Sequence, residues 1–156
     1  MSKFEFQTTA NGEELNGKLV GVIDEDVDFA QYNLTPYKKI DLDLSGIKSI
    51  NSCGIREWIL WMSTAKDASV VFNECPKIIV DQINMVQGFL PANGRVQSFQ
   101  VPYYSEESDE EKNILFTFGK EFDDTGVHPP ANIQCSKGTP MEMDVLEARY
   151  FKFIKK

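Results

Sequence analysis

Residues 39–62 of the chain read KIDLDLSGIKSINSCGIREWILWM. The segment IDLDL alternates apolar and acidic residues, which is the period-two pattern of a half-buried strand. A turn is expected at Ser45-Gly46, and a helical pattern begins after Asn51-Ser52-Cys53-Gly54. The stretch therefore predicts a strand that leads through a small polar loop into the N-terminus of a helix. Because the first amides of a helix are unpaired donors with positive partial charge, this loop suits a capping side chain or an anion.

The chain before this stretch predicts a β-hairpin and a short connection. Residues 3–9 and 18–23 carry the two apolar runs of the hairpin, with turn residues between them. Residues 24–28 place four acids in five positions, and the segment up to Pro36 is expected to form a short helix or an irregular turn. We interpret the acids as solvated surface, because a metal site needs oxygens that converge in space.

The chain after this stretch alternates helices and strands. A helix is predicted over residues 55–66, a buried strand over 69–72, a helix over 78–86 that Gly88 ends, and a final strand over 96–101. The full order is β-β-short α-β-α-β-α-β. Parallel neighbours need crossover connections, so this order predicts an α/β fold with a mixed β-sheet and helices packed against it.

This order of elements, together with the sequence IDLDLSGIKSINSCGI, resembles a STAS domain (sulfate transporter and anti-sigma factor antagonist) over residues 3–101. Members of that family carry an Asp-Ser-Ser/Thr-Gly loop at the same junction. In its bacterial anti-sigma factor antagonists, a partner kinase phosphorylates the serine after the aspartate, and the matching residue here is Ser52. Asn51 stands where the family usually has Asp, and Cys53 replaces the second hydroxyl residue.

The resemblance implies a non-catalytic regulatory module of bacterial signalling that binds an anti-sigma factor or a kinase. The expected switch loop and partner-binding residues are Asn51, Ser52, Cys53, Gly54, Arg56 and Trp58. A phosphate on Ser52 would add about −1.5 to −2 charges, with Arg56 as its counter-ion. The alternative is that Ser52 or Asn51 serves only as the helix cap. Two other functions stay open, namely a sensor of nucleotides or anions and a structural scaffold subunit.

Two residue types in this region have competing interpretations. Trp58, Trp61 and Met62 fall on neighbouring faces of the predicted helix, so at least one tryptophan is expected to be exposed as part of a partner surface. Cys53 follows Ser52 near the helix N-terminus, where a thiol can become reactive. The favoured interpretation of Cys53 is a small residue buried under the loop.

Residues 102–156 predict a small β-rich unit appended to the first domain. Ser105-x-x-Ser108 and Cys135-x-x-Gly138 are spaced like the two knuckles of a zinc ribbon, which this segment resembles. One thiolate cannot hold structural zinc, so neither a metal nor another cofactor is expected. The unit is expected to dock on the first domain through its aromatic residues, namely Tyr103, Phe116, Phe118, Tyr150, Phe151 and Phe153.

The composition limits the classes of partner. A content of 42% hydrophobic residues with eleven Phe supports a packed core, and a net charge of −8 argues against binding to nucleic acid or to an anionic membrane. No stretch approaches the length of a membrane span and the first residues carry no signal sequence, so a cytoplasmic protein is expected. The three cysteines are expected to be reduced. His128 lies in a predicted surface loop and no nucleophile motif is present, so the chain is not expected to be an enzyme.

Overall fold

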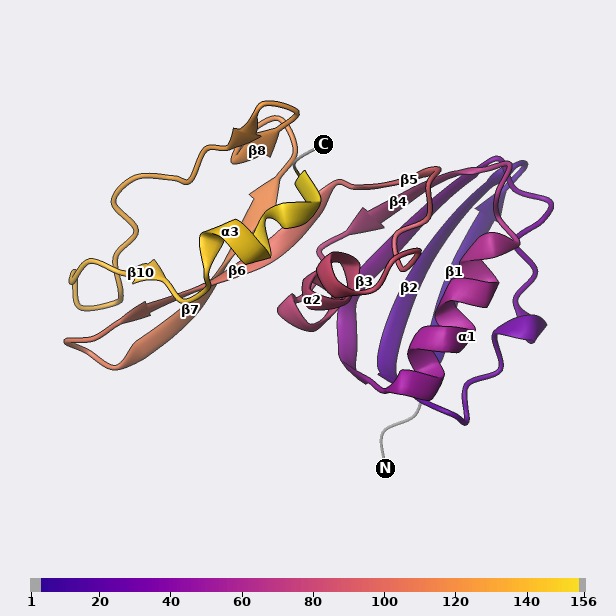
Figure 1. Cartoon of the computed structure of the whole chain (residues 1–156), viewed down its shortest axis with the longest axis horizontal. Helices are drawn as coiled ribbons and strands as arrows, with labels where there is room; N and C mark the ends of the chain where they lie inside the picture. The colour runs from indigo at the N-terminus through magenta and orange to yellow at the C-terminus, as the bar shows by residue number, and fades with distance from the viewer. Residues whose placement is uncertain (1–3, 155–156) are drawn as a thin grey trace.

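The computed structural model describes residues 4–154, which form two lobes (Figure 1). The first lobe holds a five-stranded mixed sheet, and the second holds a three-stranded sheet and a two-stranded ribbon. The predicted α/β class, with a mixed sheet and helices packed against it, is confirmed. Residue 3, where the first predicted domain begins, lies outside the described residues. No helix within residues 4–154 is long and apolar enough to cross a membrane.

The first sheet has the strand order β1-β2-β3-β4-β5. Its strands are β1 (Glu5–Asn11), β2 (Glu14–Ile23), β3 (Lys39–Ile50), β4 (Ser69–Asn73) and β5 (Gly94–Val96). β1 and β2 pair in an antiparallel manner, which confirms the predicted opening hairpin, and all later neighbours are parallel. The crossovers contain η1 (Phe29–Gln31), α1 (Ser52–Ser63) and α2 (Lys77–Met85).

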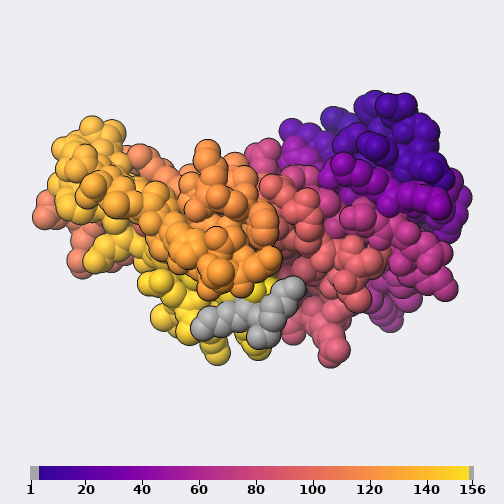
Figure 2. All heavy atoms as spheres, turned by 90° about the horizontal axis from the view of Figure 1, so that it is seen from above, coloured from indigo at the N-terminus to yellow at the C-terminus, as the bar shows by residue number. Residues whose placement is uncertain are grey.

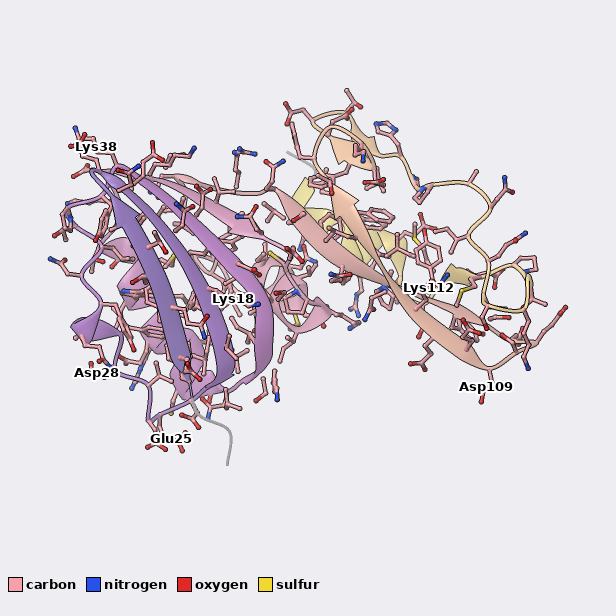
Figure 3. All side chains as sticks on the ribbon, turned by 180° about the vertical axis from the view of Figure 1, so that it is seen from behind. Lys18, Glu25, Asp28, Lys38, Asp109 and Lys112 are labelled. Carbon is pink, nitrogen blue, oxygen red and sulfur yellow. The ribbon has the colours of Figure 1, made fainter. Side chains whose placement is uncertain are left out.

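Both helices cover the same face of the first sheet, and the other face is open (Figures 1 and 3). The strand alternation explains this arrangement, because the apolar residues of IDLDL are buried toward the helices while Asp41 and Asp43 lie on the opposite face, half-buried. Lys18 points from β2 into solvent on that face (Figure 3). One helical layer on one sheet therefore buries the core of this lobe.

The turn predicted at Ser45-Gly46 is wrong, because β3 continues without interruption to Ile50. β2 runs beside it to Ile23, so backbone partners remain available along the whole length. Two irregularities in the β2–β3 register occur in this part of the pair. Gly46 is needed for the close approach of the strands, since a Cβ there would lie 2.8 Å from the Leu19 carbonyl oxygen.

The single strand predicted over residues 96–101 is divided between the two sheets. β5 ends at Val96, and β6 (Ser98–Ser105) begins the second sheet after Gln97 alone. Cys75, which follows β4, forms a parallel bridge with Phe99 in β6. β6 thus runs across the boundary predicted between residues 101 and 102, and the division into two domains stays a prediction.

The second lobe is built on β6 and β7 (Glu110–Thr117), which form a hairpin, with β10 (Glu142–Met143) on the other side of β6. β8 (Phe122–Asp123) and β9 (Gly126–Val127) form the ribbon, and α3 (Glu147–Tyr150) and η2 (Lys152–Ile154) end the chain. Phe99 is the centre of an aromatic cluster, with the rings of Phe116, Phe122, Tyr150, Phe151 and Phe153 around it. Figure 2 shows the two lobes as one elongated body.

Candidate functional site

The loop before α1 lies at the edge of the sheet where the parallel strands β2 and β3 end. The loop that follows β2 lies at this edge too, where Figure 3 shows Glu25. Asn51 connects the two loops: its Oδ1 accepts a hydrogen bond from the Gly54 amide at 2.8 Å, and its Nδ2 donates to Glu25 Oε1 at 2.8 Å. The helix cap is therefore Asn51 and not Ser52.

Gly54 fixes the first turn of α1 against the end of β2. The residue is buried, and a Cβ at this position would overlap the Ile23 carbonyl group, with only 2.8 Å to its carbon. The Asn51 amide donates to the same Ile23 carbonyl oxygen at 3.1 Å. The loop is consequently held by backbone contacts on both sides of Ser52, and its conformation does not depend on the serine side chain.

Ser52 and Cys53 are the first two residues of α1, and both are exposed. The favoured interpretation of Cys53 as a buried residue under the loop is wrong, because Gly54 occupies the position that packs against β2. Arg56 follows one turn after Ser52, and its side chain is 77% exposed and 3.8 Å from the Glu57 carboxylate. An exposed pair at this distance is weak, so Arg56 is free to contact another anion.

Both negative and positive groups surround the loop before α1. Asp24, Glu25 and Asp26 bring their carboxylate oxygens within 4.8 Å of one another. The hydrogen bond from Asn51 lowers the pKa of Glu25 and thus stabilises the ionised form of this carboxylate. The positive end of α1 and Arg56 favour an anion nearby, whereas the acidic loop opposes one. A phosphate on Ser52 would therefore change the local balance of charge strongly.

Trp58 does not belong to a partner surface, and that prediction is wrong. Its side chain is fully buried, its Nε1 donates to the Phe89 carbonyl oxygen at 3.0 Å, and its ring stacks on Phe89. Trp61 is 4% exposed, and its Nε1 donates to the Tyr32 carbonyl oxygen at 2.8 Å. Both indoles are core residues because loops outside the helix supply carbonyl partners for their N–H groups.

Leu60 is the large apolar residue that α1 turns outward, at 57% exposure. The sequence analysis does not predict this exposure, because it assigns the partner surface of the helix to a tryptophan. Ser52, Arg56 and Leu60 are spaced by four residues, so they share one exposed stripe along the helix. We call these three residues the α1 stripe.

The zinc-ribbon-like positions do converge in the second lobe. The Thr139 hydroxyl lies 3.1 Å from Ser105 Oγ and 2.6 Å from Cys135 Sγ. The Ser108 amide donates to Ser105 Oγ at 3.4 Å, which closes the first knuckle. Gly138 forms the second turn, with a φ of +80° and its amide 3.0 Å from the Cys135 carbonyl oxygen. Thr139 is the member that sequence reasoning missed, since no spacing rule marks it.

This cluster makes Cys135 an acidic thiol. The Ser108 and Thr139 hydroxyl groups lower its pKa to about 7. The Ser108 oxygen is buried beside the sulfur and makes no hydrogen bond of regular geometry with the described residues. One thiol among hydroxyl groups is a poor ligand set for structural zinc, which prefers sulfur and imidazole. The expectation of no metal stays a prediction on this chemical ground.

His128 lies on the surface of the second lobe, as expected for a loop residue. Its Nε2 is 3.2 Å from both Asp123 Oδ1 and Thr125 Oγ1. In a catalytic triad the carboxylate and the nucleophile face opposite nitrogens of the imidazole. Here both groups face the same nitrogen, so the arrangement does not have triad geometry. The Thr125 hydrogen bonds, with a smaller contribution from His128, lower the pKa of Asp123 to about 2.

Comparison of the chain with protein-family models, with curated proteins and with solved structures finds no match. The resemblance to STAS domains therefore depends on the residues and on the arrangement of elements described above.

Proposed function

We propose that this chain is a non-catalytic regulatory module of the STAS type, similar to anti-sigma factor antagonists, that binds a protein partner in the cytoplasm. The observation that carries the proposal is the position of Ser52. It is exposed on the first turn of α1, in a loop that Asn51 and Gly54 hold at the edge where β2 and β3 end. The order of elements, a hairpin followed by parallel strands with intervening helices, supports the STAS-like assignment.

The α1 stripe is the docking surface of this proposal. Leu60 supplies exposed apolar area, Arg56 supplies a charge, and Ser52 lies at the end next to the acidic loop. Asn51 and Cys53 border the stripe, whereas Trp58 supports it from the core. An anti-sigma factor or a kinase is the partner class that the resemblance implies.

Phosphorylation of Ser52 would act as the switch. The added charge lies one turn before Arg56, so the phosphate would draw the guanidinium away from Glu57 and from a bound partner. The same charge would meet the ionised Glu25 across Asn51. Two negative charges entering a docked apolar surface also cost desolvation, so the phosphorylated form is expected to release the partner.

Ser52→Ala and Ser52→Asp test this switch in an affinity purification from the source cell, with intact-mass analysis of the bait. We expect Ser52→Ala to retain the partner and Ser52→Asp to lose it, because aspartate brings part of the charge of a phosphate to the docking surface. Ser45→Asp is the matched control, since Ser45 is an exposed serine on β3, on the sheet face opposite the helices. It should retain the partner.

Three outcomes would count against parts of this proposal. Identical partners for both Ser52 variants would exclude the switch. A stable complex that forms equally well with Ser52→Ala, Ser52→Asp and Leu60→Glu would favour the scaffold alternative. The nucleotide or anion sensor would be favoured by a shift in melting temperature with such ligands at millimolar concentration in the absence of any partner.

A further inference from the structure

A groove of about 790 Å³ lies between α2 and the C-terminal segment, at the junction of the two lobes. Figure 1 shows α2 and α3 facing each other there. The residues that the argument uses are Lys77, Met85, Met143, Leu146, Arg149 and Lys152. The volume falls within the range of small-molecule sites, which often lie between packed units of a fold. We call it the α2–α3 groove.

The walls of the groove are fixed to each other. Asn84 in α2 donates from Nδ2 to the Tyr150 carbonyl oxygen at 2.9 Å, and its Oδ1 accepts from the Phe153 amide at 2.9 Å. The Tyr150 hydroxyl donates to the Gln100 carbonyl oxygen, and its ring is 3% exposed. The groove therefore exists before a ligand binds, and a ligand does not have to order its walls.

Apolar side chains on the two walls are exposed to an unusual degree. Met85 on α2 is 71% exposed and Leu146 before α3 is 70% exposed. The next most exposed large apolar residue within residues 4–154 is Leu60, at 57%. Met143 also lines the groove and is half-buried. A ligand that covers these side chains removes apolar surface from water, and methionine adapts well to the shape of such a ligand.

The charge of the groove differs in sign from that of the chain. Three basic and two acidic residues line it, which gives +1, whereas the whole chain carries −8. Lys77 is paired with Asp81 at 2.8 Å. Arg149 and Lys152 make no ion pair with any residue in the described range 4–154. Two unpaired cations next to exposed apolar side chains favour a molecule with an apolar body and one anionic end.

We propose that the α2–α3 groove binds a small amphipathic carboxylate of the acyl type. Its chain lies between Met85 and Leu146, and its carboxylate pairs with Arg149 and Lys152. The planar guanidinium of Arg149 matches a carboxylate in two-point geometry, which fixes the end of the ligand. This site is separate from the α1 stripe, so the inference does not depend on the proposed role of Ser52.

Calorimetric titration of the full chain with octanoate, decanoate and dodecanoate tests the site. The affinity should rise by about fourfold for each added methylene group that becomes buried. Dodecanol and dodecyltrimethylammonium, which lack the carboxylate, should bind at least about tenfold more weakly than dodecanoate. No binding of dodecanoate at about 1 mM would overturn the proposal, as would equal binding of the three ligands that share a twelve-carbon chain.

Matched variants locate the binding. The double variant Arg149→Glu, Lys152→Glu should weaken dodecanoate binding at least about tenfold, whereas Lys48→Glu, Lys66→Glu makes the same change of net charge elsewhere and should not. Met85→Ser should also weaken dodecanoate binding. Its control is Leu115→Ser, because Leu115 is an exposed leucine on β7. All six substituted side chains are exposed, and circular dichroism would verify that each variant protein folds. Equal effects of groove and control variants would overturn the proposal.

Discussion

Gly54 determines how closely the first turn of α1 approaches the end of β2. A methyl group there would overlap the Ile23 carbonyl group, which is backbone and cannot rotate away. We expect Gly54→Ala to lower the free energy of unfolding by about 3 kcal/mol, as measured by urea denaturation. Cys53→Ala changes the exposed neighbour and should alter stability by less than about 0.5 kcal/mol. Equal losses in the two variants would contradict the close contact.

Cys135 gives the stability of the protein a defined dependence on pH. Its pKa is about 7 in the folded chain and 9.0 for an ordinary cysteine. A lowered pKa means that the folded state prefers the thiolate, so this contribution is complete above pH 9, declines as the pH falls and is lost below about 7. The free energy of unfolding should therefore rise between these values.

Urea denaturation of the wild type and of Cys135→Ser across this pH interval would measure the effect. The difference in stability between the two should grow as the pH increases, whereas Cys53→Ser should follow the wild type. Burial raises the pKa of Cys75, so that thiol stays protonated in the folded chain throughout the interval. A difference that is constant with pH would exclude the thiolate.

At the scale of elements, α2 is tied to the C-terminal segment through one side chain. Asn84→Ala removes the hydrogen bonds to the Tyr150 carbonyl and the Phe153 amide. Since both backbone groups lose their partner, we expect a loss of about 2 kcal/mol in stability. Hydrogen exchange at the Phe153 amide should accelerate, with no change in α1. Gln87→Ala, an exposed position just after α2, is the control and should leave this exchange rate unchanged.

Patterns within single elements predicted much of the first lobe. The alternation in IDLDL gave the direction of each β3 side chain, and the order of elements gave the mixed sheet. The predicted helix start at residue 55 is three residues late, because the loop pattern includes Ser52 whereas the Asn51 side chain caps a helix that begins there. The burial of Trp58 was missed because its partner, the Phe89 carbonyl, comes from a distant segment that no helical periodicity can indicate.

At the scale of the whole molecule, the sequence predicted a second unit but not how it joins the first. A continuous β pattern over residues 96–101 does not reveal that Val96 and Phe99 belong to different sheets. Ser105, Ser108 and Cys135, which the knuckle spacing marks, lie together in the structure, while the zinc-ribbon resemblance itself stays a prediction. No sequence pattern predicts the α2–α3 groove, because its walls come from distant parts of the chain. Asn84 on one wall bonds Tyr150 and Phe153 on the other, which are 66 and 69 residues away.

The connection between the lobes has a mechanical consequence. The Gln97 amide donates to the Phe72 carbonyl oxygen of the first sheet at 2.8 Å, and the Gln97 carbonyl accepts from the Phe118 amide of the second lobe at 2.8 Å. A hinge needs a residue whose backbone can rotate, whereas the Gln97 backbone is hydrogen-bonded to both lobes. We therefore expect the second lobe, out to the hairpin tip at Asp109 (Figure 3), to keep a fixed orientation relative to the first sheet.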